Sequence, residues 1–261
     1  MNETTVSIET RYGDAPIFVF ADHASNAIPA DYNDLGLPED VLETHIAWDI
    51  GAGALATRIA ETLNGTLFTC TYSRLIIDPN RSLATKDLIP ATSDQIPIPG
   101  NQMLSEAERK ERIERLYVPY HNQLAASIDA FTPRAPLPFV VSVHSFTKRM
   151  MGAVEDRPWN VGMLWRQDEA SANTVIEWLR KNTDWAIGSN EPYDAREFNY
   201  SIDRHVGAKD IKHLTFEVRQ DMLMSDQSVD SVAAALSEAI AHTAMEAINH
   251  VADETGKQPL I

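Results

Sequence analysis

Short runs of consecutive apolar residues alternate along the chain with longer stretches in which apolar residues recur every three or four positions. The continuous runs predict strands covered on both faces, because such strands need apolar side chains throughout. These runs lie at residues 17–21, 67–72, 75–77, 139–143, 161–165, 185–187 and 214–218. The helical spacing predicts helices at residues 38–63, 105–131, 170–181 and 229–251. This order predicts an α/β fold, with a mostly parallel but mixed, twisted sheet and helices on both faces.

Turn-forming and capping residues refine this pattern. Gly51 and Gly53 interrupt the first helical stretch, so it forms either one kinked helix or two helical pieces. Ser105 and Glu108 have the spacing of a capping box, which predicts that the second helix starts there. Residues 78–102 carry four prolines and no periodicity, and loops of this length are typically functional or mobile.

Length and charge narrow the class of protein. A chain of 261 residues with 44% hydrophobic content can build one large α/β domain or two small ones. No linker or repeat divides it, so we expect one domain over residues 1–261 with its core at 16–252. The formal net charge of −16 argues against a nucleic-acid partner, since affinity for phosphates comes from Lys and Arg. No apolar run approaches the roughly 20 residues that a membrane helix needs, and no obligate protein partner is indicated.

Cysteine usage and the first residues bear on the compartment. Cys70 is the sole cysteine, so an intrachain disulfide is impossible and a reducing compartment is expected. The first ten residues are polar and acidic, without the basic and apolar regions of a secretory signal. We therefore expect a cytoplasmic protein.

Two of the predicted strands end in a histidine. His23 follows the run at residues 17–21, and His144 ends the run that begins at residue 139. Because parallel strands place their carboxyl ends at one edge of the sheet, both imidazoles are expected in one crevice. A shared metal is the simplest reason to bring them together, and zinc takes three such protein ligands with an open position. The alternative is that each histidine caps its own strand.

The third metal ligand has two candidates. Asp49 lies four residues after His45 on a predicted helix, so both side chains project from one face. An ordinary helical contact between His45 and Asp49 is about as consistent with this spacing. Asn26 follows His23 by three residues, but a neutral amide is a weaker zinc ligand than a carboxylate.

Glu217 lies near the end of another apolar run, and a carboxylate there needs a partner to stay charged. A water activated by the metal is one such partner, which makes Glu217 a candidate general base. Arg219 is the other candidate partner, because residues two apart on a strand share a face. A structural Glu217–Arg219 pair therefore stays open.

A basic segment suggests a carboxylate substrate. Arg74, Asn80 and Arg81 surround a short predicted strand, and arginine binds carboxylates through two parallel N–H bonds. The alternative is that one arginine pairs with Asp78 and only fixes the loop. His205 lies in a polar, Gly-flanked segment, from which it could contact the substrate or an oxyanion.

Five ordered blocks of sequence contain most of these residues. They read DHASNAIP, HIAWDIGA, YSRLIIDPNR, VSVHSF and FEVRQD, and they cover most of the chain between residues 18 and 221. No phosphate-binding, serine-hydrolase or helical zinc-protease motif is present. Together the five blocks resemble the N-formylglutamate amidohydrolase family.

The resemblance implies an α/β domain similar to zinc carboxypeptidases and aspartoacylases. It also implies a metal-dependent enzyme that hydrolyses N-formyl-L-glutamate, or a related N-acyl amino acid, to formate and the free amino acid, as in histidine degradation. By position, His23 and His144 match the family's strand-end histidines and Glu217 its carboxylate. The substrate carboxylates would be held by Arg74, Asn80 and Arg81, and Arg219, beside Glu217, would also bind the substrate. Asn26 stands where the related carboxypeptidases have a glutamate ligand.

The resulting hypothesis is an amidohydrolase with one divalent metal, Zn²⁺, held by His23, Asp49 and His144. Its substrate is a small N-acyl amino acid that bears a carboxylate. Two alternatives remain at this level. One is a carboxypeptidase-like enzyme or an N-acetyl amino acid deacylase, and the other is a metal-free binding protein that has kept the fold, which Asn26 favours.

Overall fold

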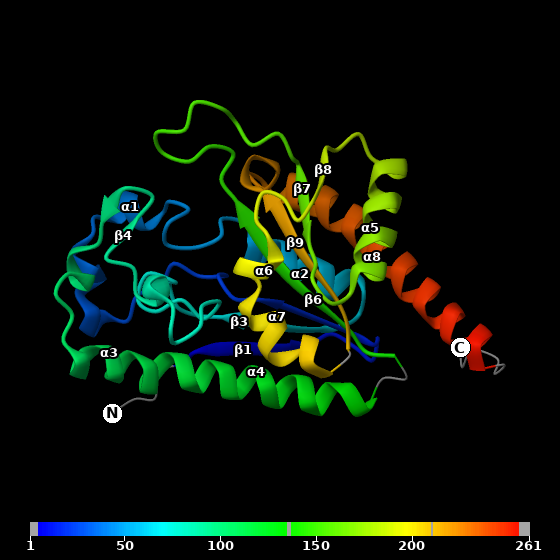
Figure 1. Ribbon diagram of the computed structural model, residues 1–261, viewed down its shortest axis with the longest axis horizontal. Helices are drawn as coiled ribbons and strands as arrows, with labels where there is room; N and C mark the ends of the chain where they lie inside the picture. The colour runs from blue at the N-terminus through cyan, green and yellow to red at the C-terminus, as the bar shows by residue number, and fades with distance from the viewer. Residues whose placement is uncertain (1–4, 135–136, 210, 256–261) are drawn as a thin grey trace.

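A seven-stranded mixed sheet forms the centre of the computed structural model, with helices on both of its faces (Figure 1). The structure describes residues 5–134, 137–209 and 211–255. The strands follow the spatial order β1-β3-β2-β6-β9-β7-β8. Their bounds are β1 Ser7–Arg11, β2 Ile17–Ala21, β3 Thr66–Cys70, β6 Phe139–Phe146, β7 Val161–Leu164, β8 Ile187–Ser189 and β9 Lys212–Arg219. A separate hairpin pairs β4 Thr92–Ser93 with β5 Ile96–Pro97.

The four central strands β3, β2, β6 and β9 are all parallel to their neighbours in this group. Outside them, β1 joins β3 and β7 joins β9 in antiparallel fashion, while β8 is parallel to β7. The expected mostly parallel, mixed sheet is therefore confirmed. The carboxyl ends of β2, β6 and β9 lie at the same edge, as side chains that act together require.

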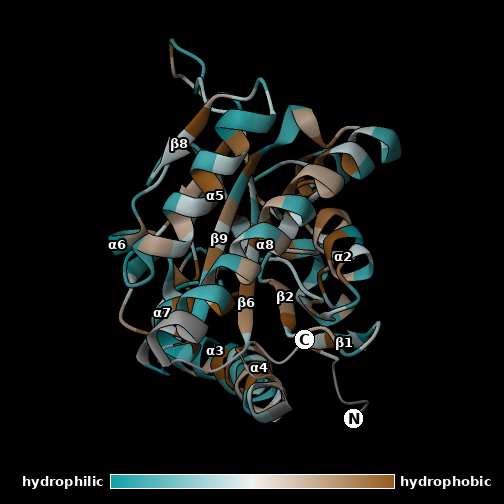
Figure 2. Cartoon of the chain, turned by 90° about the vertical axis from the view of Figure 1, so that its right-hand side faces the viewer, coloured by the Kyte–Doolittle hydropathy of each residue, from teal (hydrophilic) through white to brown (hydrophobic). Residues whose placement is uncertain are grey.

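Helices pack on both faces because the residues of β2, β3 and β6 alternate between two hydrophobic cores. In β2, Val19 and Ala21 face one core, while Phe18 and Phe20 face the other. The first core is covered by α2 Ala52–Thr62, α5 Glu169–Asn182 and α8 Asp226–Thr255. The second is covered by α4 Val118–Phe131, with α7 Tyr200–His205 beside it. The helix α3 Glu106–Arg112 precedes α4 along the chain. Figure 2 shows β2, β6 and β9 as mainly hydrophobic strands behind helices that carry both hydrophilic and hydrophobic residues.

Several shorter elements complete the chain. Two further helices are α1 Glu39–Leu42 and α6 Ala195–Phe198. A π-helical turn at Ile113–Tyr117 joins α3 to α4, ahead of Pro119, which has no N–H to donate. Other short helical turns lie at Ala30–Gly36, Lys86–Leu88, Pro99–Asn101, Thr132–Arg134, Gly207–Lys209 and Gln220–Met222. Within the described ranges, no helix is both long enough and apolar enough to cross a bilayer.

The capping box at the start of α3 is confirmed. The Ser105 hydroxyl accepts a hydrogen bond from the Glu108 amide at 3.2 Å, and the Glu108 carboxylate accepts one from the Ser105 amide at 2.8 Å. These two bonds satisfy two backbone donors that the first helical turn would otherwise leave without partners.

Two predicted elements differ in the structure. The first helical stretch forms two pieces, α1 and α2, which is one of its two expected forms. The turns at residues 43–51 lie between them, so neither His45 nor Asp49 lies on the helix on which both were expected. The apolar run at residues 75–77 is a buried turn and not a strand. Its apolar side chains belong to the core beneath α4, and Arg112 of α3 donates to the Ile76 carbonyl.

Candidate active site

A cavity of about 330 Å³ opens at the carboxyl ends of the central parallel strands. His23 lies two residues beyond β2, His144 lies near the end of β6, and Glu217 lies on β9. His144 and Glu217 are direct partners in the parallel register of β6 and β9. The sheet therefore fixes the relative positions of these groups through backbone hydrogen bonds.

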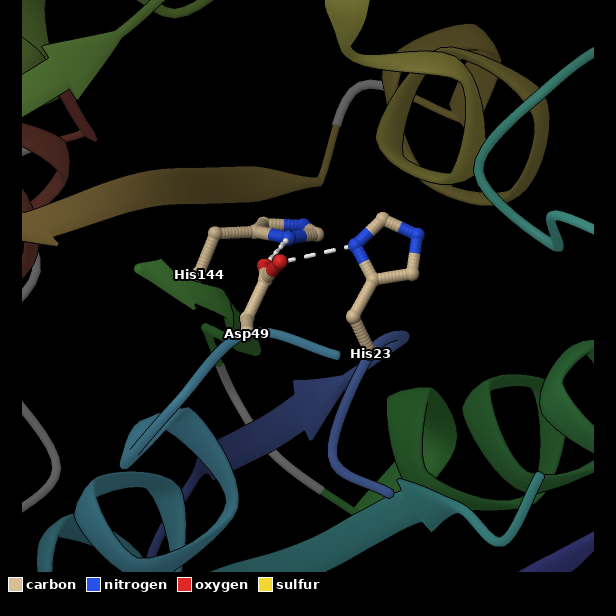
Figure 3. Close-up of side chains that lie close together, drawn as sticks. All are labelled: His23, Asp49 and His144. Carbon is tan, nitrogen blue, oxygen red and sulfur yellow. Dashed lines mark hydrogen bonds and ion pairs between the residues drawn. The ribbon is translucent and has the colours of Figure 1, made fainter. Parts of the chain in front are cut away.

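Three buried side chains at the floor of this cavity could hold a metal ion. One donor atom from each of His23, Asp49 and His144 lies within 4.8 Å of the other two. As Figure 3 shows, the two imidazoles flank the Asp49 carboxylate, and Oδ2 of Asp49 lies 2.8 Å from Nδ1 of His144 and 3.3 Å from Nδ1 of His23. Two imidazoles and one carboxylate are a donor set that suits zinc with one open position. We call these residues the His-Asp-His cluster.

Asp49 reaches the cluster from the turn between α1 and α2. Its backbone N–H donates to the carbonyl of His23 at 3.0 Å, and its own carbonyl accepts from Ala52 at the start of α2. The other predicted third ligand, Asn26, lies outside the cluster. Its amide donates to the Leu42 carbonyl at 3.1 Å and to Glu43 at 3.2 Å.

A further carboxylate lies beside the second nitrogen of each histidine. Nε2 of His23 is 2.7 Å from Oδ1 of Asp78, and Nε2 of His144 is 3.7 Å from Oδ2 of Asp22. Asp22 is fully buried and accepts hydrogen bonds from the hydroxyls of Tyr120 and Ser201. The hydrogen bond to Asp78 fixes the tautomer of His23 with Nδ1 available as a ligand atom, while Asp22 places a negative charge beside the far nitrogen of His144. Sequence reasoning gave neither aspartate this role, although Asp22 directly precedes His23.

The charges of the cluster stabilise one another. Burial alone would lower the pKa of His144, but the hydrogen bond and charge of Asp49 outweigh it and raise that pKa to about 9. Burial would likewise raise the pKa of Asp49, yet the two imidazoles and Arg74 hold it well below its usual range. A carboxylate that stays ionised in this way is a suitable ligand for a cation.

Glu217 has two properties of a general base, a raised pKa and a carboxyl oxygen without a hydrogen-bond partner among the described residues. Burial raises its pKa to about 7, although the charge of His144 opposes this. Its Oε2 atom is buried and accepts no hydrogen bond from the described part of the chain. A buried carboxyl oxygen without a protein partner, in a cavity beside a candidate metal site, can take a proton from a water molecule.

The three substrate-binding candidates of the basic segment all line the cavity, in different states. Arg74 donates to Asp49 at 3.1 Å and to Asp78 at 2.9 Å, so the pairing left open from the sequence is present for this residue. Asn80 accepts a hydrogen bond from the Ser201 amide at 3.0 Å. Nε of Arg81 lies 3.9 Å from Oδ2 of Asp78.

Two other candidates, His205 and Arg219, do not line the cavity, so their predicted contact with substrate gains no support from its geometry. His205 is buried on α7, where its Nε2 lies 2.8 Å from Nδ1 of His121 on α4. The segment predicted as a polar loop is helical, which turns this imidazole toward α4. Arg219 donates to Asp221 and to the backbone carbonyls of residues 157–159 ahead of β7. Within the described contacts, no hydrogen bond joins it to Glu217.

Among the cavity residues that the sequence did not indicate are His45 and Asp94. Nε2 of His45 donates to the Asp94 carboxylate at 2.9 Å, and both residues line the cavity. Asp94 belongs to the β4–β5 hairpin, and its carboxylate also accepts from the Met151 amide. His45 could have been found as a histidine of the second sequence block, whereas the hairpin carries no signal that assigns Asp94 to the site.

The comparisons with known proteins assign a class of reaction to this cavity of acids and histidines. The family model described as N-formylglutamate amidohydrolase matches residues 15–224. The chain therefore belongs to the N-formylglutamate amidohydrolase family and is a hydrolase that acts on an amide bond.

Two solved structures resemble the whole chain. A gene product of Agrobacterium tumefaciens has 29% sequence identity and a TM-score of 0.88, with 95% of this chain and 97% of that chain covered. The N-formylglutamate amidohydrolase of Ralstonia eutropha JMP134 shares the fold at 19% identity and a TM-score of 0.74, with 92% and 97% covered. Among curated proteins, none matches this chain significantly.

Proposed function

We propose that the protein is a metal-dependent amidohydrolase that cleaves the formyl or acyl amide of N-formyl-L-glutamate or a related N-acyl amino acid. The products would be formate, or the corresponding acid, and the free amino acid. The observation that carries this proposal is the position of Glu217, whose buried oxygen lacks a protein partner in the same cavity as the His-Asp-His cluster. Family membership supports the amide bond as the target.

In this proposal, His23, Asp49 and His144 hold one divalent metal, for which we propose Zn²⁺. When bound, such an ion supplies Lewis acidity to the scissile carbonyl. Glu217 takes the proton of the attacking water and returns it to the leaving nitrogen. The pKa of Glu217, raised to about 7 by burial, suits both steps near neutral pH because the group then accepts and releases a proton easily.

The residues of the basic segment that line the cavity, Arg74, Asn80 and Arg81, orient the substrate. Arg81 and Asn80 contact the substrate, Arg81 through a carboxylate, which places the amide against Glu217. Arg74 lies at the same wall, where it holds Asp49 and Asp78 in place. A reducing, cytoplasmic compartment remains part of the proposal, because Cys70 is the one cysteine and its thiol is buried.

The proposal is tested with purified protein loaded with Zn²⁺ or stripped by a chelator. Formate release from a panel of N-formyl amino acids should require the metal and return when Zn²⁺ is restored. Release that survives complete removal of the metal would contradict the metal-dependent mechanism. Absence of release from every N-formyl and N-acetyl amino acid by metal-loaded protein would remove the proposed activity.

Glu217→Gln is the sharpest variant, because it keeps the size of the side chain and removes the proton acceptor. We expect kcat to fall by roughly 100-fold or more, with the metal content unchanged. Glu238→Gln on the exposed face of α8 is the matched control and should keep full activity. A Glu217→Gln enzyme with kcat near that of the parent would exclude Glu217 as the base.

A further inference from the structure

Arg81 is held in the cavity wall by contacts with both its side chain and its backbone. Its guanidinium lies over the ring of Phe198 on α6, 5.0 Å from the centroid, and its Nε lies 3.9 Å from Oδ2 of Asp78. Its backbone carbonyl accepts a hydrogen bond of 2.7 Å from the hydroxyl of Tyr117. Nη1 is 3.4 Å from the Asn80 carbonyl, while Nη2 donates no hydrogen bond to a described residue. Arg81 therefore keeps a donor for a carboxylate in the cavity that it lines.

Tyr117 lies behind this contact and does not line the cavity. It is buried, and it is the last residue of the π-helical turn Ile113–Tyr117 that leads into α4. Turns of this kind are rare and frequently occur at functional sites. The Tyr117 hydroxyl also accepts from Arg204 at 3.5 Å, on α7, which lies beside α4 (Figure 1). The hydroxyl that holds the Arg81 carbonyl is thus placed by the helices and not by the loop that carries Arg81.

A second hydrogen bond ties the same loop to α7. The backbone amide of Ser201 donates to Oδ1 of Asn80 at 3.0 Å. Because a backbone N–H can only donate, this bond fixes which end of the Asn80 amide faces α7. The NH₂ group of Asn80 is then the end that remains available to a ligand. The helical layer therefore orients the donors of both Asn80 and Arg81 before any substrate binds.

We infer that Tyr117 is a positioning residue for substrate binding. Its hydroxyl holds the backbone of Arg81 where the guanidinium meets a substrate carboxylate, and Tyr117 itself contacts neither the substrate nor the His-Asp-His cluster. A binding group that is already ordered costs less entropy when the substrate binds. Loss of the hydroxyl should therefore weaken substrate binding and leave the proton transfers at Glu217 unchanged. This inference rests on the proposed amidohydrolase activity and adds a residue to its substrate-binding machinery.

The first test is Tyr117→Phe, which removes the hydroxyl and keeps the ring that fills the core. We expect KM for N-formyl-L-glutamate to rise by roughly 3- to 10-fold, because one hydrogen bond is lost. Neither kcat nor the zinc content of the purified protein should change, since only binding is affected. Tyr32→Phe is the matched control. Its hydroxyl donates to Glu111 at 2.9 Å outside the cavity, so KM should stay at the value of the parent.

A double-mutant cycle with Arg81→Gln assigns the effect to the side chain of Arg81. This change removes the guanidinium and keeps the backbone carbonyl that Tyr117 holds. Tyr117→Phe should then lower kcat/KM by roughly 3- to 10-fold in the parent. In the Arg81→Gln background it should lower kcat/KM by less than about twofold, because contacts that act through one group are not additive. A merely structural role of Tyr117 would give the same factor in both backgrounds.

The outcomes separate the inference from the proposed function. An unchanged KM in Tyr117→Phe, or a lower kcat at an unchanged KM, would overturn the positioning role and leave the amidohydrolase intact. Equal losses of kcat/KM in the two backgrounds would also overturn it, because Tyr117 would then act through the fold. Failure of the parent enzyme to cleave any N-acyl amino acid would overturn the proposed function and the inference with it.

Discussion

Both site histidines have a carboxylate beside the nitrogen that faces away from Asp49. Asp78 is 2.7 Å from His23, and Asp22 is 3.7 Å from His144. Asp22 is the less ordinary of the two, because it is fully buried and one of its oxygens lacks a hydrogen bond among the described residues. Burial raises the pKa of Asp22 in spite of the two neighbouring histidines. Burying this carboxylate costs free energy, so Asp22 contributes little to the stability of the fold. We infer that it orients the imidazole of His144.

Replacing Asp22 should therefore weaken metal binding. We expect Asp22→Asn to raise the dissociation constant for Zn²⁺ by roughly 10- to 100-fold, measured by competition with a chromogenic chelator. Tyr120→Phe is the matched control, because it removes a hydrogen bond to Asp22 and keeps the carboxylate beside His144. If folded Asp22→Asn bound Zn²⁺ as tightly as the parent, the orienting role would be wrong.

Elements of the fold differ in how far the sequence predicts them. Continuous apolar runs predict the central strands β2 and β6 because strands buried on both faces leave no room for polar side chains. The run at residues 75–77 has the same composition but forms a buried turn. There the polar backbone is satisfied by side chains, and such long-range partners are not visible in a local pattern.

In the candidate site, too, local sequence patterns predict some positions, and long-range contacts determine the others. The strand-end residues His23, His144 and Glu217 could be predicted to lie together, because parallel strands bring their ends to one edge. Asp49 was expected to reach the site from a helix, whereas it lies in a turn. His205 was misplaced because its environment depends on how α7 packs against α4, which no local spacing encodes.

Arg112 illustrates an element held by such a long-range contact. Its guanidinium is buried and donates to the Ile76 carbonyl, to Asn101 and to the Gly100 carbonyl. Arg112→Met would leave these acceptors without partners, so we expect the free energy of unfolding to fall by about 3 kcal/mol. Lys110→Met, two residues earlier on α3 and exposed, should change it by less than about 0.5 kcal/mol. Urea denaturation of both variants measures the free energy of unfolding. Equal decreases in the two variants would contradict a stabilising role for the hydrogen bonds of Arg112.

At the scale of the whole molecule, the contact between α4 and α7 should make stability depend on pH. Burial, with the charge of Arg204, lowers the pKa of His205 to about 4 and that of His121 to about 2. The unfolded chain binds these protons near pH 6.5, so acidification below that value favours unfolding. Stability contributed by these neutral histidines is present above pH 6.5 and is lost as pH falls toward 4 and below.

The expected slope is up to about 1.4 kcal/mol per pH unit for each histidine. His205→Gln should flatten the fall in unfolding free energy between pH 6.5 and 4.5, measured by urea denaturation of metal-free protein. His242→Gln, at an exposed position of α8, should leave the slope as it is in the parent. A parent-like slope in His205→Gln would show that this pair does not control acid stability.

The register of β6 and β9, which sets His144 opposite Glu217, has a consequence for how this molecule can be altered. The groups that would break the bond stand on or beside the rigid sheet, whereas the cavity residues Asn80, Arg81 and Asp94 all lie on the irregular segment between β3 and α3. Libraries of variants confined to that segment could be screened for new acyl amino acids without rebuilding the reaction centre. A variant that accepts a different substrate would then keep the strands of the sheet and differ only in this segment.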